Sequence, residues 1–269
     1  MHMRIATWNL NNRSRNQVAW DVLLSLNPDV ALLSEVNFIP DDLSGYAGLF
    51  ETAMGPDRQP RRFKTGLIVR GEIGDAVPLR ARQPWVNEAL SVFTGNFVGR
   101  TIRLGSGEVL HVISVHMPSW QFPYREFTTG DVSDVMLPNY SKMYMSELLW
   151  AALQNSMPHY CRDVIVGGDF NTSEFIGSSK RQHEANREAI RRMCELGFVE
   201  TVRHLNGGPV PTWRSRQKNA PLKHQLDHLY VSGTLRDRLL RAWVCEQGAI
   251  FDKDLSDHLP VIAEFDSPG

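Results

Sequence analysis

Short apolar runs that end in polar residues recur along the chain and predict buried strands. Residues 30–33 lead to Glu35, and residues 164–166 lead through two glycines to Asp169 and Asn171. A continuous apolar run bounded by glycine or polar residues is typical of a strand buried on both faces. Because α/β sheets bind ligands at the carboxyl ends of their strands, we expect these polar side chains to lie at a reactive edge.

Two segments with helical spacing of apolar residues, 18–26 and 141–155, predict helices, and Ser141 is the expected N-cap of the second. Strands predicted at 4–8 and 109–115 precede these helices, and a buried strand follows each of them. The chain therefore contains the order strand, helix, strand twice.

The two units resemble one another weakly. Asp29 precedes Glu35 by the same interval that separates Asp163 from Asp169. We interpret this as a weak internal duplication, in which each half delivers one carboxylate from the end of a strand.

Further strand-like segments at 65–70, 87–94, 225–231 and 260–265 are mostly expected to be antiparallel neighbours. The whole pattern predicts an α/β (α+β) fold, a four-layer sandwich of two mixed, mostly antiparallel β-sheets packed face to face with helices outside. At 269 residues and without an internal linker, the chain is expected to form a single domain spanning residues 1–269.

Composition predicts a soluble globular protein with a formal net charge of −1. No apolar stretch is long enough to span a membrane, and the first residues lack the features of a secretory signal. Cys161, Cys194 and Cys245 are far apart and lack metal-type spacing. A cytoplasmic location is the simplest interpretation, and no protein partner is implied.

Basic residues nevertheless cluster, and local potential attracts a polyanion more than net charge does. One group, containing Arg61 and Arg62, is expected in a loop at 58–64, a second surrounds a helix at 180–192, and a third lies in the acid-free stretch 201–224. We select Arg61, Arg62, Arg214 and Arg216 as candidate substrate contacts. Solvated surface is the alternative for each.

Six short motifs occur in order along the chain. They are Thr7-Trp8-Asn9-Leu10-Asn11, Leu33-Ser34-Glu35-Val36, Val115-His116, Gly168-Asp169-Phe170-Asn171, Gln225-Leu226-Asp227-His228 and Ser256-Asp257-His258. Over residues 5–265 this set resembles the endonuclease/exonuclease/phosphatase superfamily, which includes deoxyribonucleases, apurinic endonucleases and inositol-polyphosphate 5-phosphatases. Ser34 departs from the glutamine that is usual before the glutamate, which puts a supporting hydrogen bond in doubt and leaves the ligand in place.

The resemblance implies metal-assisted phosphoester hydrolysis, and the residue types agree. A phosphodiester is anionic and repels hydroxide, so hydrolysis needs a hard cation and donors to the non-bridging oxygens. Oxygen ligands from Asn9, Glu35 and Asp257 suit Mg²⁺, with Mn²⁺ as a possible substitute. Taken alone, Glu35 would be an ordinary solvent-facing acid at a strand end, and the motif set outweighs that interpretation.

His258 is the candidate base, or an electrostatic partner of the scissile phosphate, because imidazole titrates near neutral pH. Asp227 lies within an apolar run, where an unpaired aspartate is rare, and we expect it to hydrogen-bond and orient His258. His228 is expected to point to the opposite sheet face and to pack there.

The resemblance assigns three further residues to the phosphate. Asp169 would orient the attacking water, protonate the leaving oxygen or hold a second metal, and the sequence leaves these alternatives open. His116 and Asn171 are expected to donate to the phosphoryl oxygens. Asn11 is expected to be a second polar ligand or a partner for Asn9, and a simple turn residue is the alternative.

Specificity is expected to reside in loops. The long loop 119–139 carries several aromatic residues that would either stack on bases or form a satellite hydrophobic cluster, and the two interpretations are equally supported. Trp213 precedes the motif at 225–227 and is expected to contact the nucleotide beside the scissile bond, with a core position as the alternative.

Together these features predict a Mg²⁺-dependent phosphodiesterase acting on nucleic acid, with a DNA endonuclease or exonuclease as the first choice. A phosphatase acting on a phosphoinositide or inositol polyphosphate is one alternative, and a catalytically silent binding module of the same fold is another. The aromatic content favours bases over inositol, and retention of all six motifs disfavours the silent module.

Overall fold

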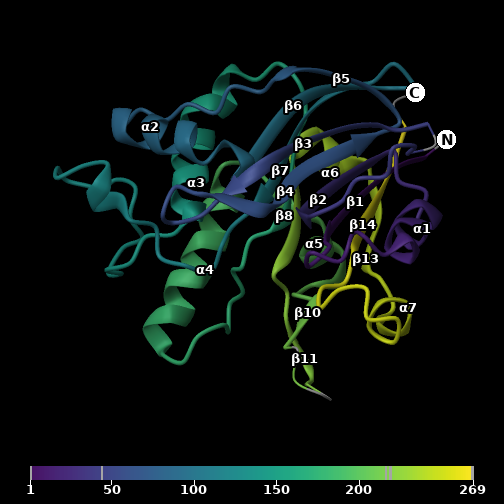
Figure 1. Cartoon of the computed structure of the whole chain (residues 1–269). Coiled ribbons are helices and arrows are strands. Elements are labelled where there is room, and N and C mark those ends of the chain that lie inside the picture. Colours follow the sequence, from purple (N-terminus) through teal and green to yellow (C-terminus); the bar gives the residue numbers. More distant parts are fainter. Residues whose placement is uncertain (1, 44, 216, 218–219, 268–269) are drawn as a thin grey trace.

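The computed structural model describes residues 2–43, 45–215, 217 and 220–267. It contains two six-stranded β-sheets packed face to face, with helices over the outer faces (Figure 1). The predicted four-layer sandwich is therefore confirmed. The two ends of the described chain lie close together, because β1 pairs with β14 and aligns His2 with Asp266.

The first sheet has the strand order β13-β14-β1-β2-β4-β3. Its strands are β1 (His2–Asn9), β2 (Val30–Val36), β3 (Ala47–Met54), β4 (Pro60–Val69), β13 (Leu239–Val244) and β14 (Val261–Asp266). The second sheet has the order β5-β6-β7-β8-β12-β9. Its strands are β5 (Gly71–Ala76), β6 (Phe97–Leu104), β7 (Val109–His116), β8 (Val164–Asp169), β9 (Val199–Glu200) and β12 (Asp227–Val231). A small separate pair, β10 (Trp213–Arg214) and β11 (Leu222–His224), projects beyond the sheets (Figure 1).

Alternate residues of the central strands form the core between the sheets, because successive side chains in a strand point to opposite faces. Ile5 and Leu32 of the first sheet pack in one cluster with Val112 and Ile165 of the second. Val202 of α5 (Thr201–Asn206) and Leu235 of α6 (Gly233–Asp237) join this cluster.

Helices cover the other face of each sheet. The first sheet packs against α1 (Gln17–Ser25) and α7 (Gln247–Phe251). The second packs against α2 (Pro84–Val92), α3 (Met145–Ser156) and α4 (Lys180–Glu195). Three short 3₁₀ helices complete the described elements, at Thr94–Asn96, Tyr124–Glu126 and Met157–His159.

Each sheet contains one parallel pair, β1 with β2 and β7 with β8, and the remaining pairs are antiparallel. A helix, α1 or α3, connects the two strands of each parallel pair, as the repeated strand–helix–strand order predicts. Asn9 aligns with Ser34 in one pair and His116 aligns with Asp169 in the other. Parallel pairing thus brings the motif residues to the carboxyl ends of adjacent strands.

Three local predictions are wrong. The segment 87–94 belongs mainly to a helix, α2, which begins at Pro84; Trp85, Val86, Ala89 and Leu90 form its buried face at helical spacing. Ser141 does not cap α3, which begins at Met145, where Glu147 accepts a hydrogen bond from the backbone nitrogen of Tyr144. The residues around Arg61 and Arg62 form the start of β4 instead of a loop.

No described helix has the length and apolar content needed to cross a membrane. The three cysteines are free thiols.

Candidate active site

The motif residues converge where the carboxyl ends of β1, β2, β7 and β8 meet the start of β12 and the segment before β14. Gly168 makes this convergence possible, because its φ is +149° and an added Cβ would lie 1.9 Å from the carbonyl oxygen of Val115. Glycine therefore lets β8 approach β7 closely just before Asp169.

Asp227 and His258 form a buried pair at the centre of the site. Oδ2 of Asp227 lies 2.8 Å from Nδ1 of His258, and Thr212 donates its hydroxyl to the same oxygen over 2.7 Å. Ser256 supports the histidine backbone, because its Oγ accepts from the nitrogen of His258 and donates to the carbonyl of Asn9. The hydrogen bond expected from the sequence is present, and it leaves Nε2 of the imidazole facing the other carboxylates.

Those carboxylates belong to Asp169 and Asp257, and one oxygen of each lies 4.0 Å from Nε2 of His258. Burial by itself lowers the pKa of His258, but the negative charges of Asp227, Asp169 and Asp257 outweigh it and raise the pKa. The positively charged imidazolium is thus favoured in the structure.

Asn9 and Glu35 meet beside this pair. The amide nitrogen of Asn9 donates to Asp169 over 2.9 Å and to Glu35 over 3.2 Å, while its amide oxygen accepts from the backbone nitrogen of Asn11. The amide oxygen, which is the atom that would bind a cation, faces away from the carboxylates. Binding of a cation by Asn9 would therefore require its side-chain amide to rotate by about half a turn. Asn11 is buried and lies in a turn with a φ of +46°, and it is its backbone nitrogen that donates to Asn9.

Asn12 is a further site residue that the sequence reasoning did not select. Its side-chain nitrogen donates to Oε2 of Glu35 over 2.6 Å. Glu35 has a φ of +51° in an irregular part of the pairing between β2 and β4. A left-handed conformation in a non-glycine residue is typical of a functional position held by its surroundings. The adjacent pair Asn11-Asn12 was the only signal for Asn12 in the sequence.

His116 approaches the other side of Glu35, with Nε2 3.5 Å from Oε1, and Phe63 packs edge-on against its ring. Burial would raise the pKa of Glu35, but the hydrogen bond and charge of His116, together with Asn9, lower it overall. Glu35 is therefore an ionised carboxylate, with 22% of its side chain exposed.

Asp169 and Asn171 occupy the end of β8. Asn171 donates its backbone nitrogen to Oδ1 of Asp169 over 2.8 Å, and its side-chain nitrogen to Oδ2 over 3.1 Å and to the carbonyl of Met117 over 2.7 Å. Burial is the largest influence on Asp169, and with the charge of Asp227 it raises the pKa of this carboxyl group. His228 lies on the other face, packed on Phe170, as predicted.

The charges of the site favour a bound cation. Glu35, Asp169 and Asp227 have no described Lys or Arg as a hydrogen-bond or ion-pair partner, and Oδ1 of Asp227 is buried without a described hydrogen-bond partner. Side-chain ligand atoms cluster within 4.8 Å of one another in two groups, Glu35 with His116 and Asp169, and Asp169 with Asp227 and His258. The His258 imidazolium offsets one of these negative charges, so the site keeps an excess of carboxylates. Buried negative charge in excess is costly, and hard oxygen donors in this number fit a divalent metal ion.

Trp213 and Arg214 lie at the edge of this site on β10. Trp213 bridges to His258 through the backbone and is half-buried, with its ring stacked on His224 at 6.3 Å. The guanidinium of Arg214 lies 3.9 Å from the ring centre of Phe251, and the backbone nitrogen of Arg214 donates to the backbone carbonyl of Asp257. Arg216, the remaining candidate of this segment, lies outside the described residues.

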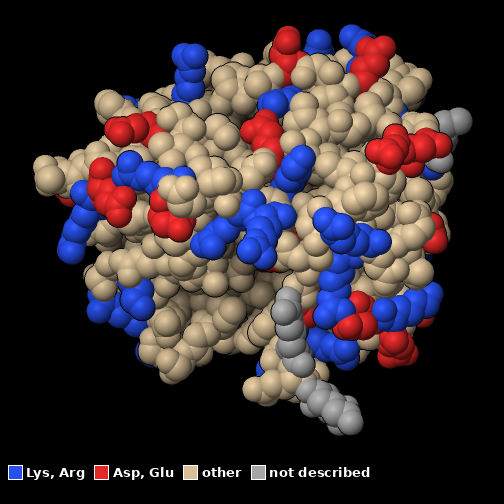
Figure 2. Space-filling view, viewed as in Figure 1, with Lys and Arg blue, Asp and Glu red and all other residues tan. Residues whose placement is uncertain are grey.

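Arg61 and Arg62 are exposed on β4, near Phe63, which contacts His116. Neither forms an ion pair with any acid in the described part of the chain. Figure 2 shows Lys and Arg side chains gathered across the middle of this face, over the region that β4 and β8 occupy in Figure 1. In contrast, Arg191, Arg192 and Arg203 of the other basic segments are paired with Glu188 or Glu174.

The aromatic residues of the loop 119–139 form a satellite cluster. Phe93 of the α2 C-cap contacts Trp120, Phe122 and Phe127, and Phe122 also stacks on Phe127. Phe122 is fully buried. Of the two interpretations of this loop, the structure therefore favours packing over stacking on bases.

A family model described as the endonuclease/exonuclease/phosphatase family matches residues 6–258. The chain belongs to this family. The members of this family are metal-dependent phosphoesterases. The resemblance inferred from the six motifs is therefore confirmed. No curated protein matches the sequence significantly.

Solved structures similar to this family member show the same fold. The 3′ phosphatase NExo from Neisseria, bound to a product DNA hairpin, is 20% identical with a TM-score of 0.67, covering 98% of this chain and 100% of its own. The APE2 catalytic domain from Xenopus laevis is 17% identical with a TM-score of 0.68, and the match covers 97% of this chain and 91% of the APE2 chain. The AP endonuclease LMAP from Leishmania major is 16% identical with a TM-score of 0.67, and the match covers 99% of this chain and 88% of the LMAP chain.

Proposed function

We propose that this protein is a Mg²⁺-dependent phosphodiesterase that hydrolyses nucleic acid, with DNA as its first substrate. The observation that carries the proposal is the buried Asp227–His258 pair, whose free Nε2 faces the carboxylates of Asp169 and Asp257 at 4.0 Å. Such an arrangement combines a fixed imidazole with acidic groups that a cation would neutralise.

The imidazole is fixed by its partners. Because Asp227 occupies Nδ1 and Thr212 fixes Asp227, only Nε2 is directed to the substrate. The raised pKa of His258 supports a charged imidazolium, which stabilises negative charge on a phosphoryl oxygen as the attack proceeds.

Asp169 is proposed to orient the attacking water and to accept its proton. Its raised pKa makes the carboxylate a better proton acceptor near neutral pH, and Asn171 holds both of its oxygens. His116 and Asn171 are proposed as donors to the phosphoryl oxygens. Both amide hydrogens of Asn171 are already donated, to Met117 and Asp169, so Asn171 would give up its longer bond, the one to Asp169, in order to donate to the phosphate.

Glu35 and Asp257, with Asn9 after its amide has turned, are proposed to hold the Mg²⁺ ion, for which Mn²⁺ could substitute. When bound, the ion supplies charge neutralisation at the phosphate. Asn12 keeps Glu35 in place through its hydrogen bond to Oε2.

DNA is proposed as the substrate on two grounds. Exposed Arg61 and Arg62, together with Arg214 of β10, provide cations for a phosphate backbone, and Trp213 provides a half-buried aromatic face beside His258. Arg216, which lies outside the described residues, stays a candidate from the sequence. Similar structures include a 3′ phosphatase bound to a DNA hairpin and AP endonucleases.

The test is a comparison of substrates by the purified protein with Mg²⁺ and with chelator. Labelled single-stranded DNA, duplex DNA, abasic duplex DNA, RNA and a soluble inositol polyphosphate would be incubated with the protein and with its His258→Ala variant. We expect Mg²⁺-dependent cleavage of DNA that the variant has largely lost. Phosphate release from the inositol polyphosphate alone would replace this proposal with the phosphatase alternative, and inactivity on every substrate would favour the silent module.

A further inference from the structure

A hollow of about 170 Å³ opens beside Asn171, between the segment that follows β7 and the first turns of α4. Asn171 and Met117 line it, and the side-chain nitrogen of Asn171 donates to the carbonyl of Met117 over 2.7 Å. The hollow therefore adjoins the candidate active site at Asn171. It lies on the Asn171 side of the site, and Trp213 and His224 do not contribute to its lining.

The lining of the hollow contains no charged side chain among the described residues. Tyr140 and Tyr144 form one wall, with their rings stacked at a centroid distance of 6.4 Å and an angle of 21°. Burial and the neighbouring Tyr140 raise the pKa of the Tyr144 phenol, which therefore stays neutral at physiological pH. Such a surface suits a flat, neutral group and disfavours a phosphate.

The opposite wall comes from α4. Ala189 leaves space on this wall, and Gln182 and Asn186 add side-chain amides. Asn186 donates to the carbonyl of Ile176 over 2.9 Å, and Oε1 of Gln182 accepts from the backbone nitrogens of residues 178 and 179. These bonds hold the amide groups in place at the edge of the hollow.

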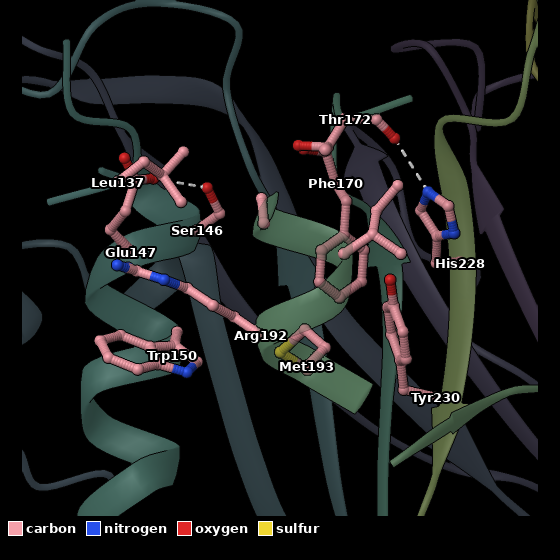
Figure 3. Close-up of a pocket in the computed structure, with 12 residues that line it drawn as sticks. Leu137, Ser146, Glu147, Trp150, Phe170, Thr172, Arg192, Met193, His228 and Tyr230 are labelled. Atoms are coloured by element: carbon pink, nitrogen blue, oxygen red, sulfur yellow. Dashed lines mark hydrogen bonds between the residues drawn. The ribbon is translucent and has the colours of Figure 1, made fainter. Parts of the chain in front are cut away.

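A second pocket adjoins the hollow and shares Leu137, Ser146 and Phe170 with it. Figure 3, a close-up of this second pocket, shows Arg192 extended over Trp150. The guanidinium lies 4.1 Å from the ring centre of Trp150 and donates to the carbonyls of Val135 and Met136 over 2.6 and 2.9 Å. These contacts connect the loop that carries Tyr140 to α3 and α4. The tyrosine wall of the hollow is therefore held in place before a ligand binds.

We propose that this hollow receives an unpaired nucleobase next to the scissile phosphate. The inference rests on the proposed function, because it places the phosphate beside Asn171 and so brings the adjacent nucleoside to the mouth of the hollow. A base has two flat faces for the tyrosine wall and polar edges for Gln182 and Asn186, and it carries no charge. A base that lies between the tyrosine wall and α4 cannot remain stacked in a duplex, so the substrate class is single-stranded or locally unpaired nucleic acid.

Two variants on α4 separate the hollow from the rest of the site. Ala189→Phe fills it, and Arg187→Phe places the same side chain at an exposed position of the same helix that does not line it. A third variant, Tyr140→Ala, removes part of the aromatic wall and serves as an independent test if Ala189→Phe lowers stability. Thermal unfolding would show that each variant is folded.

The first measurement is binding of 2-aminopurine deoxynucleoside 5′-monophosphate in Ca²⁺, followed by quenching of its fluorescence on stacking. We expect saturable quenching by the wild-type protein and by Arg187→Phe. In Ala189→Phe and Tyr140→Ala the affinity should fall about 5- to 150-fold, which corresponds to the roughly 1–3 kcal/mol that one stacked base contributes. Absence of binding to the wild type, or equal binding to all four proteins, would overturn the proposal.

The second measurement compares hydrolysis of thymidine 5′-(p-nitrophenyl phosphate) with that of methyl p-nitrophenyl phosphate, which lacks the nucleoside. We expect kcat/KM of the wild type to favour the thymidine ester, and the preference to be lost in Ala189→Phe while the methyl ester is hydrolysed as before. Equal loss on both esters would contradict a base site. If neither ester nor DNA is hydrolysed but base binding depends on Ala189, the proposed function fails and the base site stands.

Discussion

Asp227 accepts hydrogen bonds at one oxygen from both His258 and Thr212, over 2.8 and 2.7 Å, while its other oxygen is buried without a described hydrogen-bond partner. Thr212 also accepts from the backbone nitrogens of Leu226 and Asp227, so a single hydroxyl connects β10 to the start of β12. The geometry of the imidazole thus depends on a residue outside the six motifs.

Replacing Thr212 by valine, which keeps the shape and removes the hydroxyl, should destabilise the protein by about 1–3 kcal/mol, because it leaves buried polar groups unpaired. Thr65→Val is the matched control, since the Thr65 hydroxyl is buried and has no described hydrogen-bond partner. Urea unfolding of both variants checks this. A loss of the same size in Thr65→Val would show that the valine substitution itself, and not the hydrogen bonds, is responsible.

If Glu35 holds the metal as proposed, Glu35→Gln should weaken Mg²⁺ binding and reduce activity, with partial recovery at high Mg²⁺, because the variant lacks a hard anionic ligand. Glu72, which is exposed on β5, provides the control Glu72→Gln. Calorimetric titration of each protein with Mg²⁺ measures the effect. Unchanged affinity in Glu35→Gln would remove Glu35 from the metal site.

Arg61→Ala and Arg62→Ala should each lower the slope of log affinity for DNA against log salt by about one unit, because each phosphate contact releases counterions. Arg191, which is paired with Glu188 and Glu195, is the control, and Arg191→Ala should leave the slope unchanged. The measurement is equilibrium binding to an oligonucleotide in Ca²⁺ over a range of salt. Equal slopes in all variants would place the DNA elsewhere.

Glu147 connects pH with stability. Burial raises its pKa to about 7, above the value near 4.5 that an exposed glutamate has, so the folded state holds this proton more tightly than the unfolded state. Stability from this group is complete below about pH 4.5 and is lost as the pH rises to 7, by roughly 3 kcal/mol in total.

The variant Glu147→Gln should therefore gain stability relative to the wild type at pH 8 and gain little at pH 5. The control Glu184→Gln, at an exposed position on α4, should have nearly the stability of the wild type at both pH values. Denaturant unfolding at the two pH values decides this. A gain in Glu147→Gln that is the same at both values would mean that Glu147 does not titrate in this range.

The sequence predicts the central strands of this fold well and the outer elements poorly. β2 and β8 are buried on both faces and read as apolar runs, so their strands and the polar residues that follow them could be located. β3, β5 and β13 are half-exposed edge or near-edge strands with mixed composition, and they gave no comparable signal. The short apolar segment of α2 fits both the helical and the strand period of apolar residues. Packing of Trp85 and Leu90 against the second sheet stabilises the helix.

Part of the candidate site could likewise be predicted from the sequence, and part of it could not. Residues inside the six motifs could be named because their order along the chain resembles a known family. Asn12 and Thr212 could not, since their importance depends on which side chains the fold brings beside them. The stacking of Arg214 on Phe251 likewise depends on α7, and no local pattern near either residue indicates it.

We propose that Asp227 and His258 act as one unit in phosphodiester hydrolysis, which a double-mutant cycle under single-turnover conditions with Mg²⁺ can test. His258→Ala and Asp227→Asn should each slow DNA cleavage by about 10²–10⁴-fold. The double variant should be little slower than the worse single variant, because residues that act together are not additive. Losses that multiply would contradict the claim and mean that the two residues contribute separately, and full activity of His258→Ala would place the chemistry at another site.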